Sequence, residues 1–472
     1  MNQTVLLTKS GFLHASECRK SFWFEVHEPG RFPQPPPSLH ARMLMEEGKA
    51  VHAAARNYVL SRFEDPRFEC GFTSPEGLRA RLDALCSDGS EIDLIEIKAS
   101  TRPEEHIRDV AFQKVAVERS GVRVRKCIVI HLDPTFRSGA DRPALSVFTE
   151  RDITAEVEKV LRSTANEIDA ILDLLKLNRI DEHGCECRYK GSVARRCSAF
   201  AHLNPDIEEP SIHLLPNISA SRLRRLDDQG RLDMSKVTED DVTPAQLLHL
   251  QAFRSGKAVI DLGALASQLE TLEWPVHFYD YETHARAMPT ATGHGPHMHV
   301  PVQFSLHVLH RSGELEHHEH LSKGEGREAA LVEDLARSVG AAGSLLAWNM
   351  SFEKGRNRVL AELVPTHANF LLHLNERTRD LMLPFKTAYV DPGFGGSASI
   401  KKVLPVICPH LAYDEEAVHD GAGAMQAWRE MITSSDAARR SELDRQLRAY
   451  CRLDTLAMVE IYRHLEQIVG RN

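Results

Sequence analysis

The sequence predicts an α/β protein with two strand-containing domains and a helical segment between them. The chain has 472 residues, which exceeds the usual size of one hydrophobic core. Two separate stretches mix short apolar strands with amphipathic helices, and the polar, proline-containing stretch "NPDIEEPSIHLLPN" lies between them. We therefore expect domains at residues 1–203 and 272–472, joined by a linker and helical segment at 204–271.

The elements of the first domain follow from hydrophobic spacing. Residues 78–98 alternate like two strands around the turn "SDGS", and "VRKCIVIHL" is apolar enough for a buried strand. Apolar residues recur at helical spacing over 40–62, 105–120 and 152–177.

The second domain repeats the mixture of strands and helices. A strand begins at Val276, "VPVQFSLHVL" and "LEHHEHLS" resemble a hairpin, and "SLLAWNMSF" contains a short strand that runs into a helix. Further helices are predicted over 326–339 and 437–468. Residues 218–271, in the segment between the domains, are polar and helical.

The composition indicates an ordinary soluble protein. Hydrophobic residues make up 42% of the chain, and no apolar run reaches the roughly 18 residues of a membrane span. The net charge of −9 argues against non-specific coating of polyanions. It does not exclude a nuclease, because metal-binding carboxylates add negative charge. No signal-peptide core is evident at the N-terminus, and the spacing of the nine cysteines does not suggest a disulfide scaffold. We therefore expect a protein of the reducing cytoplasm without membrane segments.

Acidic residues in the second domain fall at spacings that suit a metal site. In "PVHFYDYETH", Asp280 and Glu282 share one face of the predicted strand. Glu353 follows a strand at the start of a helix, and Tyr450 and Asp454 lie four apart on the last helix. Alone, these would be an exposed strand edge, a helix cap and a helix-surface pair. Together they predict Mg²⁺ or Mn²⁺ bound for two-metal phosphodiester hydrolysis, with Tyr450 orienting the attacking water.

This pattern resembles the DnaQ-like exonucleases of the RNase H-like superfamily, in the DEDDy type that carries a tyrosine in its last motif. Asp280 and Glu282 match D-x-E, and Tyr450 and Asp454 match Y-x-x-x-D. "NMSFE" resembles N-x-x-F-D, with Glu353 where the family has Asp. The resemblance implies an RNase H-like mixed sheet, 3′–5′ exonuclease activity and metal ligands at the four acidic positions.

A second charged cluster lies in "RARLDALCSDGSEIDLIEIKAST". With Ser87–Ser90 as the turn, Asp83 is expected opposite Leu94, with Glu96 and Lys98 further along the same face. Two carboxylates and a lysine suit metal binding, with Lys98 stabilising the phosphorane charge or positioning water. The alternative is an ordinary edge-strand ion pair.

This cluster resembles the RecB-like branch of the PD-(D/E)xK nucleases, which have a restriction-endonuclease-like fold. Asp83 matches the motif Asp, and Glu96, Ile97 and Lys98 match E-x-K. The resemblance implies that His52 in "EEGKAVHAAA" is an additional metal ligand. It also implies a role for Gln113 in the helix motif Q-x-x-x-Y, although Val117 stands at the tyrosine position.

The same resemblance implies that four of the nine cysteines bind a metal cofactor. Some RecB-like nucleases close the domain with an iron–sulfur cluster on one early and three late cysteines. Cys18 is early here, and the late ones are Cys185, Cys187 and Cys197. Four thiolates suit a [4Fe–4S] cluster or Zn²⁺, although the C-x-C spacing is tight, and four free thiols are the alternative.

The chain as a whole resembles a bacterial family that fuses a RecB-like part to a DnaQ-like part. This implies a nuclease with two sites, acting on DNA rather than RNA in repair or anti-phage defence, with protein partners in such a complex. The alternative is a nucleic-acid-binding scaffold or partner subunit in which one or both nuclease folds are inactive.

Overall fold

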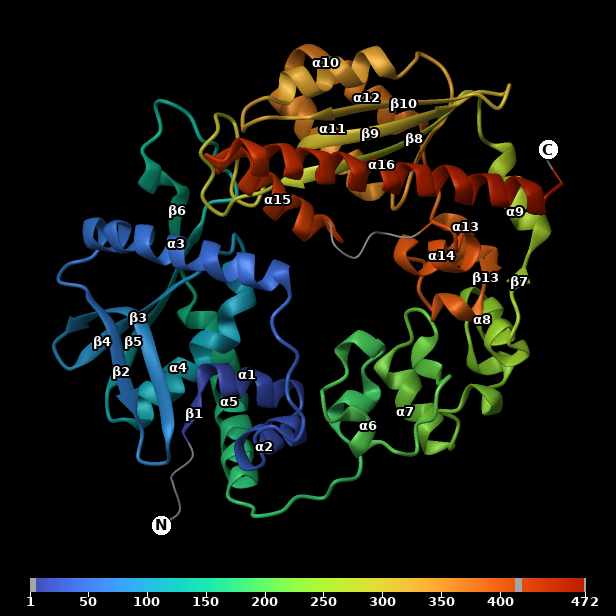
Figure 1. Ribbon diagram of the computed structural model, residues 1–472. Coiled ribbons are helices and arrows are strands. Elements are labelled where there is room, and N and C mark those ends of the chain that lie inside the picture. Colours follow the sequence, from blue (N-terminus) through green and yellow to red (C-terminus); the bar gives the residue numbers. More distant parts are fainter. Residues whose placement is uncertain (1–5, 412–417, 471–472) are drawn as a thin grey trace. The chain divides into compact units, whose positions relative to one another are not determined.

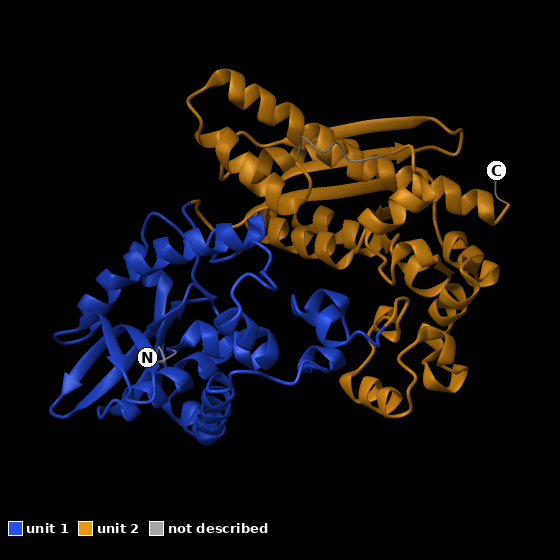
Figure 2. Ribbon diagram, turned by 60° about the horizontal axis from the view of Figure 1, so that its bottom comes forward, with its two compact units in different colours: residues 1–207, 286–290, 295–297 blue, residues 208–285, 291–294, 298–472 orange. Residues whose placement is uncertain are grey.

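The structure is a computed structural model of the chain and describes residues 6–411 and 418–470. The chain forms two compact units (Figure 2). Unit 1 comprises Met1–Ile207, Arg286–Thr290 and Gly295–His297, and unit 2 comprises the remainder. Each unit contains a mixed β-sheet, and a helical middle segment joins unit 2, so the predicted α/β class is confirmed. None of the described helices combines the length and apolar character that crossing a bilayer requires.

The sheet of unit 1 has the order β1-β3-β4-β5-β6, with β2 paired to β3 (Figure 1). β3 and β4 run antiparallel, whereas β4 and β5 run parallel. The strands are β1 (Leu7–Thr8), β2 (Arg67–Thr73), β3 (Leu78–Asp88), β4 (Glu91–Ile97), β5 (Arg123–Leu132) and β6 (Phe148–Asp152).

The three helices predicted in unit 1 from hydrophobic spacing are confirmed as α3, α4 and α5. Their ends lie within about two residues of the predicted ends. The α-helices are α1 (Lys9–Glu17), α2 (Arg19–His27), α3 (Leu39–Arg62), α4 (Ile107–Arg119), α5 (Thr154–Leu175) and α6 (Phe200–Leu203). Short 3-10 helices are η1 (Pro103–His106), η2 (Ala144–Val147), η3 (Glu186–Tyr189) and η4 (Val193–Arg195). Phe12 of α1 stacks on Phe112 of α4 with ring centroids 5.1 Å apart, which fixes α1 against the core.

The observed register of the β3–β4 hairpin differs from the predicted register. Leu94 pairs with Leu85, not with Asp83, so the register differs from the prediction by two residues. Asp88 pairs with Glu91, which leaves a two-residue turn in which Gly89 adopts a φ of 64°. Because side chains alternate along a strand, a shift of two residues leaves every side chain on its predicted face.

The middle segment contains α7 (Ala220–Asp228), α8 (Pro244–Ser255) and α9 (Leu262–Glu270). Its 3-10 helices are η5 (Ile212–Leu214), η6 (Met234–Lys236) and η7 (Glu239–Asp241). The predicted helical character is confirmed apart from the short strand β7 (Val259–Ile260). This strand pairs antiparallel with β13 (Tyr389–Val390).

The sheet of unit 2 has the order β10-β9-β8-β11-β12, with β8 at its centre. β8 runs antiparallel to β9 and parallel to β11, and β11 runs parallel to β12. These strands are β8 (Val276–His284), β9 (Val300–Leu309), β10 (Leu315–Leu321), β11 (Leu345–Ala347) and β12 (Thr378–Asp380).

Alternation along β8 assigns its side chains to two different cores. Tyr279 and Tyr281 pack in the cluster that contains residues of α10, α11 and α12, whereas Phe278 packs 5.5 Å from Tyr462 of α16. The helices of this part are α10 (Glu328–Ser338), α11 (Ser351–Leu363), α12 (Ala368–Arg377), α13 (Leu383–Thr387), α14 (Ile400–Ile407), α15 (Gly421–Thr433) and α16 (Ala437–Ile468). The remaining 3-10 helices are η8 (Pro365–His367) and η9 (Pro392–Phe394). Even-numbered residues of β8 therefore face α16, which runs along the sheet (Figure 1).

We expect Gly343→Ala to destabilise unit 2 strongly. Gly343 has a φ of 91°, and a Cβ there would lie 2.0 Å from the carbonyl oxygen of Pro275. The free energy of unfolding should fall by about 3 kcal/mol or more, measured by chemical denaturation. Gly340→Ala is the matched control, because a Cβ at Gly340 has no heavy atom within 4 Å. Equal stability of the two variants would contradict this description of the turn.

Candidate metal centres

Three carboxylates from two elements meet between β8 and α16. The candidate ligand oxygens of Asp280, Glu282 and Asp454 all lie within 4.8 Å of one another. Asp280 and Glu282 are both even-numbered residues of β8, and Asp454 lies on the helix that this face of the strand packs against. We call this group the acidic triad. It could hold a metal ion.

Two further predicted residues, Glu353 and Tyr450, are not members of the acidic triad. Glu353, in the first turn of α11, is only 2% exposed, and its charge acts on both Asp280 and Glu282. Its Oε2 has no hydrogen-bond partner among residues 6–411 and 418–470. Tyr450 is buried in a cluster that contains Trp428.

The acidic triad contains like charges in a poorly solvated place. Burial, together with the charges of Asp454, Glu282 and Glu353, raises the pKa of Asp280 well above its usual value. Burial and Asp454 raise the pKa of Glu282 to about 8, and burial raises that of Glu353 to about 8. A divalent cation would favour the ionised carboxylates and offset this cost. The oxygen-only donors and the unpartnered Oε2 of Glu353 fit Mg²⁺ or Mn²⁺.

Sequence reasoning missed one neighbour of the acidic triad. The thiol of Cys451 is fully buried and donates to Oδ2 of Asp280, with the two atoms 3.9 Å apart. Burial and the charge of Asp280 raise the pKa of this thiol. It therefore stays protonated and acts as a hydrogen-bond donor. Its position three residues before Asp454 on the last helix was the available signal.

The predicted site of unit 1 is organised around Glu96, which is 1% exposed. Lys9 Nζ donates to Oε1 of Glu96 at 2.6 Å, and Lys98 Nζ lies 3.0 Å from the same oxygen. Gln113 Nε2 donates to Oε2 at 2.8 Å. Although burial opposes ionisation, the charges of Lys9 and Lys98 hold the pKa of Glu96 below its usual value. The protein therefore supplies the counter-charges of this carboxylate itself.

Asp83 and His52, which are also predicted residues of this site, lie close to one another beside β4. The backbone N–H of Ile97 donates to Oδ2 of Asp83 at 2.8 Å, and His52 Nδ1 lies 3.9 Å from Oδ1 of Asp83. Burial and the charge of Glu96 raise the pKa of Asp83 to about 7. Burial lowers the pKa of His52. In the described part of the chain, these residues do not converge as closely as the acidic triad does.

Two residues of this cluster have no counterpart in the sequence prediction. Asp109 accepts from Lys98 Nζ at 2.8 Å, and Lys9 reaches Glu96 across 87 positions of the chain. Asp109 precedes Gln113 by four residues on α4, so helical spacing was a usable signal for it. No spacing in the sequence indicates that Lys9 contacts Glu96, because this contact depends on how α1 packs.

The four predicted cysteines converge in unit 1. The Sγ atoms of Cys18, Cys185, Cys187 and Cys197 all lie within 4.8 Å of one another, and they could hold a metal ion or an iron–sulfur cluster. Hydrogen bonding from Cys18 lowers the pKa of Cys187 to about 7. Asn204 Nδ2 donates to the sulfur of Cys185 at 3.5 Å.

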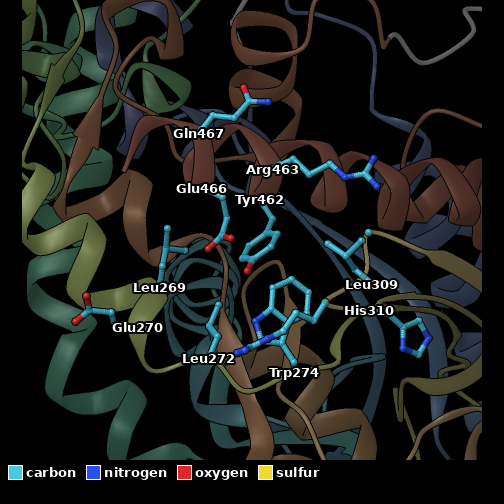
Figure 3. A pocket seen from close by; sticks show the side chains of 12 residues that line it. Leu269, Glu270, Leu272, Trp274, Leu309, His310, Tyr462, Arg463, Glu466 and Gln467 are labelled. Atoms are coloured by element: carbon cyan, nitrogen blue, oxygen red, sulfur yellow. The ribbon is translucent and has the colours of Figure 1, made fainter. Parts of the chain in front are cut away.

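A separate cavity of about 650 Å³ lies near the C-terminal end of α16 (Figure 3). Trp274, Tyr462 and Arg463 are among its lining residues. None of the predicted site residues lines it. Tyr462 lies eight residues beyond Asp454, which corresponds to about 12 Å along the helix axis.

A family model and a solved structure each match part of the chain. A family model described as a domain of unknown function (DUF2779) matches residues 277–399. This span includes Asp280, Glu282 and Glu353 but ends before Tyr450. A search of curated proteins finds no match. A solved structure, the crystal structure of SSO0001, is 13% identical and aligns over 36% of this chain and 78% of its own, with a TM-score of 0.22. A likeness this low carries no argument, and kinship with named nuclease families stays a prediction.

Metal should stabilise the protein more at high pH than at low pH. The pKa values of Glu282 and Glu353 are near 8 in the folded state against 4.5 ordinarily, so the folded state retains protons that the unfolded state has lost. Without metal, these groups make stability fall as pH rises from about 4.5 to 8. Bound Mn²⁺ replaces those protons, so its stabilisation should grow over this range.

The measurement is thermal unfolding in chelator and in Mn²⁺ across this range. Glu282→Gln removes one titrating group and should flatten the pH dependence in chelator. A shift in melting temperature with Mn²⁺ that is equal at all pH values, or absent, would contradict the account.

Proposed function

We propose that unit 2 is a metal-dependent nuclease of the DnaQ-like, RNase H-like type, acting as a 3′–5′ exonuclease on DNA. The observation that carries this proposal is the convergence of Asp280, Glu282 and Asp454 within 4.8 Å. Glu353 is buried nearby, and its Oε2 has no hydrogen-bond partner in the part of the chain that the structure describes. Such a set of oxygens is what phosphodiester hydrolysis assisted by Mg²⁺ or Mn²⁺ requires.

The arrangement of the sheet supports the RNase H-like assignment. Counted from β8, the five strands lie in the order 3-2-1-4-5, and the second runs antiparallel to the first. The resemblance implies a mixed sheet, and these strand directions agree with it. Asp280 and Glu282, which match the first acidic motif, lie on the central strand. The last helix then crosses that strand and contributes Asp454.

Each residue has a distinct role in the proposed reaction. When bound, the metal ions would supply an activated water and stabilise the leaving oxygen. The acidic triad would hold them, and Glu353 would add charge through a side chain one methylene longer than the family's Asp. Tyr450 lies one helical turn before Asp454 on the same face of α16, where its hydroxyl would orient the attacking water.

Asp454→Asn should reduce Mn²⁺-dependent cleavage by about 10³-fold or more, because it removes a proposed ligand with little change of shape. The assay compares single- and double-stranded DNA and RNA labelled at either end. Asp444→Asn, at a partly exposed carboxylate on the same helix that pairs with Lys323 and Arg448, is the matched control and should retain activity. Failure of the wild-type protein to cleave any substrate, with metal shown to bind, would reject the proposal.

For unit 1 we propose the RecB-like PD-(D/E)xK fold, with Asp83, Glu96 and Lys98 as its site. A specific observation favours the alternative that this unit binds nucleic acid without cutting it. Both oxygens of Glu96 are engaged by Lys9, Lys98 and Gln113, which compete with a metal ion for the same lone pairs.

Lys98→Ala and Asp454→Asn, made separately and together, distinguish these alternatives. If unit 2 alone cleaves, Asp454→Asn removes all activity and Lys98→Ala leaves the rate unchanged within about twofold. Residual metal-dependent cleavage in Asp454→Asn that disappears in the double variant would show instead that unit 1 has a working site.

A further inference from the structure

The segment that carries the three late cysteines has little regular structure of its own. Between α5 and α6 the chain forms only η3 and η4 among its helices, and no strand. The buried residues of its small apolar cluster are Cys18, Cys187 and Phe200. Cys185 and Cys197 also pack against the main core of unit 1, and a metal bound by the four cysteines would hold the segment between them in one conformation.

The charges and hydrogen bonds around the sulfurs suit an anionic metal centre. Four thiolates around a divalent ion leave a net charge of about −2. The stretch "CECRYKGSVARRC" carries four basic residues and one acid. Asn204 Nδ2 donates to Cys185, and the guanidinium of Arg196 lies over the ring of Phe200, with Cζ 4.2 Å from its centroid. The hydrogen bond from Asn204 stabilises a thiolate at Cys185, and Phe200 packs in one cluster with Cys18 and Cys187.

The separation of the sulfurs distinguishes between the two kinds of centre. Bonds of about 2.3 Å to one tetrahedral ion place four sulfurs about 3.8 Å apart. In a four-iron cluster each cysteine binds a different iron, so the thiolates stand on the order of 6 Å apart. Every Sγ–Sγ separation in this group is within 4.8 Å, which a single ion satisfies and a four-iron cluster does not.

We infer that Cys18, Cys185, Cys187 and Cys197 hold one tetrahedral Zn²⁺ ion with a structural role, rather than an iron–sulfur cluster. Four thiolates complete the coordination of Zn²⁺ and leave no open position for a substrate. The ion joins the junction of α1 and α2, where Cys18 lies, to the segment before α6. It thereby closes unit 1 on itself.

The metal content of the full-length protein tests this inference directly. Protein purified in parallel with and without oxygen is analysed for zinc, iron and acid-labile sulfide. We expect about one zinc per chain, no sulfide and no visible absorption in both preparations. Replacement by Co²⁺ should produce the intense absorption bands of a tetrahedral thiolate site. Iron with sulfide in the anaerobic preparation, or a chain without metal, would overturn the inference.

Variants locate the ion. Cys187→Ser removes a buried ligand and should lower the zinc content to less than about a tenth of wild type. It should also speed proteolytic cleavage between residues 177 and 199. Cys86→Ser, at a partly exposed cysteine outside the group, should retain full zinc content. If the Cys187→Ser protein folds poorly, the zinc content of the wild-type protein still tests the inference. Full zinc content in a folded Cys187→Ser protein would place the ion elsewhere and reject the site.

Discussion

The burial of several carboxylates beside one another between β8 and α16 is the constraint on which the account of unit 2 depends. Like charges in a poorly solvated place repel, and burial together with the charge of Asp454 raises the pKa of both Asp280 and Glu282. The fold holds them together nevertheless, because β8 is the central strand and α16 packs along its even-numbered face. The packing of β8 against α16 therefore imposes the repulsion between these carboxylates, and a bound divalent cation is the simplest means of offsetting it.

Both units bury carboxylates, and the electrostatic environment of these carboxylates differs between the units. In unit 1 the buried carboxylate of Glu96 is neutralised by Lys9 and Lys98, so the ionised form is stable without a ligand. In unit 2, burial and the charge of Asp454 raise the pKa of Glu282 to about 8, so its ionised form is disfavoured near neutral pH without a ligand. This difference is the physical reason for assigning proposed catalysis to unit 2 first. The cysteine group of unit 1 is a third arrangement, in which the inferred metal serves the fold and not a reaction.

Sequence patterns of short range were sufficient to predict much of this arrangement. The alternation along one strand placed Asp280 and Glu282 on a common face, and the helical repeat placed Asp454 one turn beyond Tyr450. Features that depend on packing between distant segments were not accessible. No local pattern indicates that Lys9 contacts Glu96, that β7 pairs with β13, or that Glu353 lies outside the group of closest carboxylates. The β3–β4 register differed by two residues because alternation fixes the face of a strand but not the length of its turn.

The central claim is that the acidic triad binds a divalent cation, and Mn²⁺ binding followed by electron paramagnetic resonance tests it most directly. The titration is done near pH 8, where Glu282 and Glu353 are about half ionised without metal. The account predicts saturable Mn²⁺ binding to the wild-type protein and to Asp444→Asn, and at least about tenfold weaker binding to Asp280→Asn. Equal binding to all three proteins would place the metal elsewhere and contradict the account.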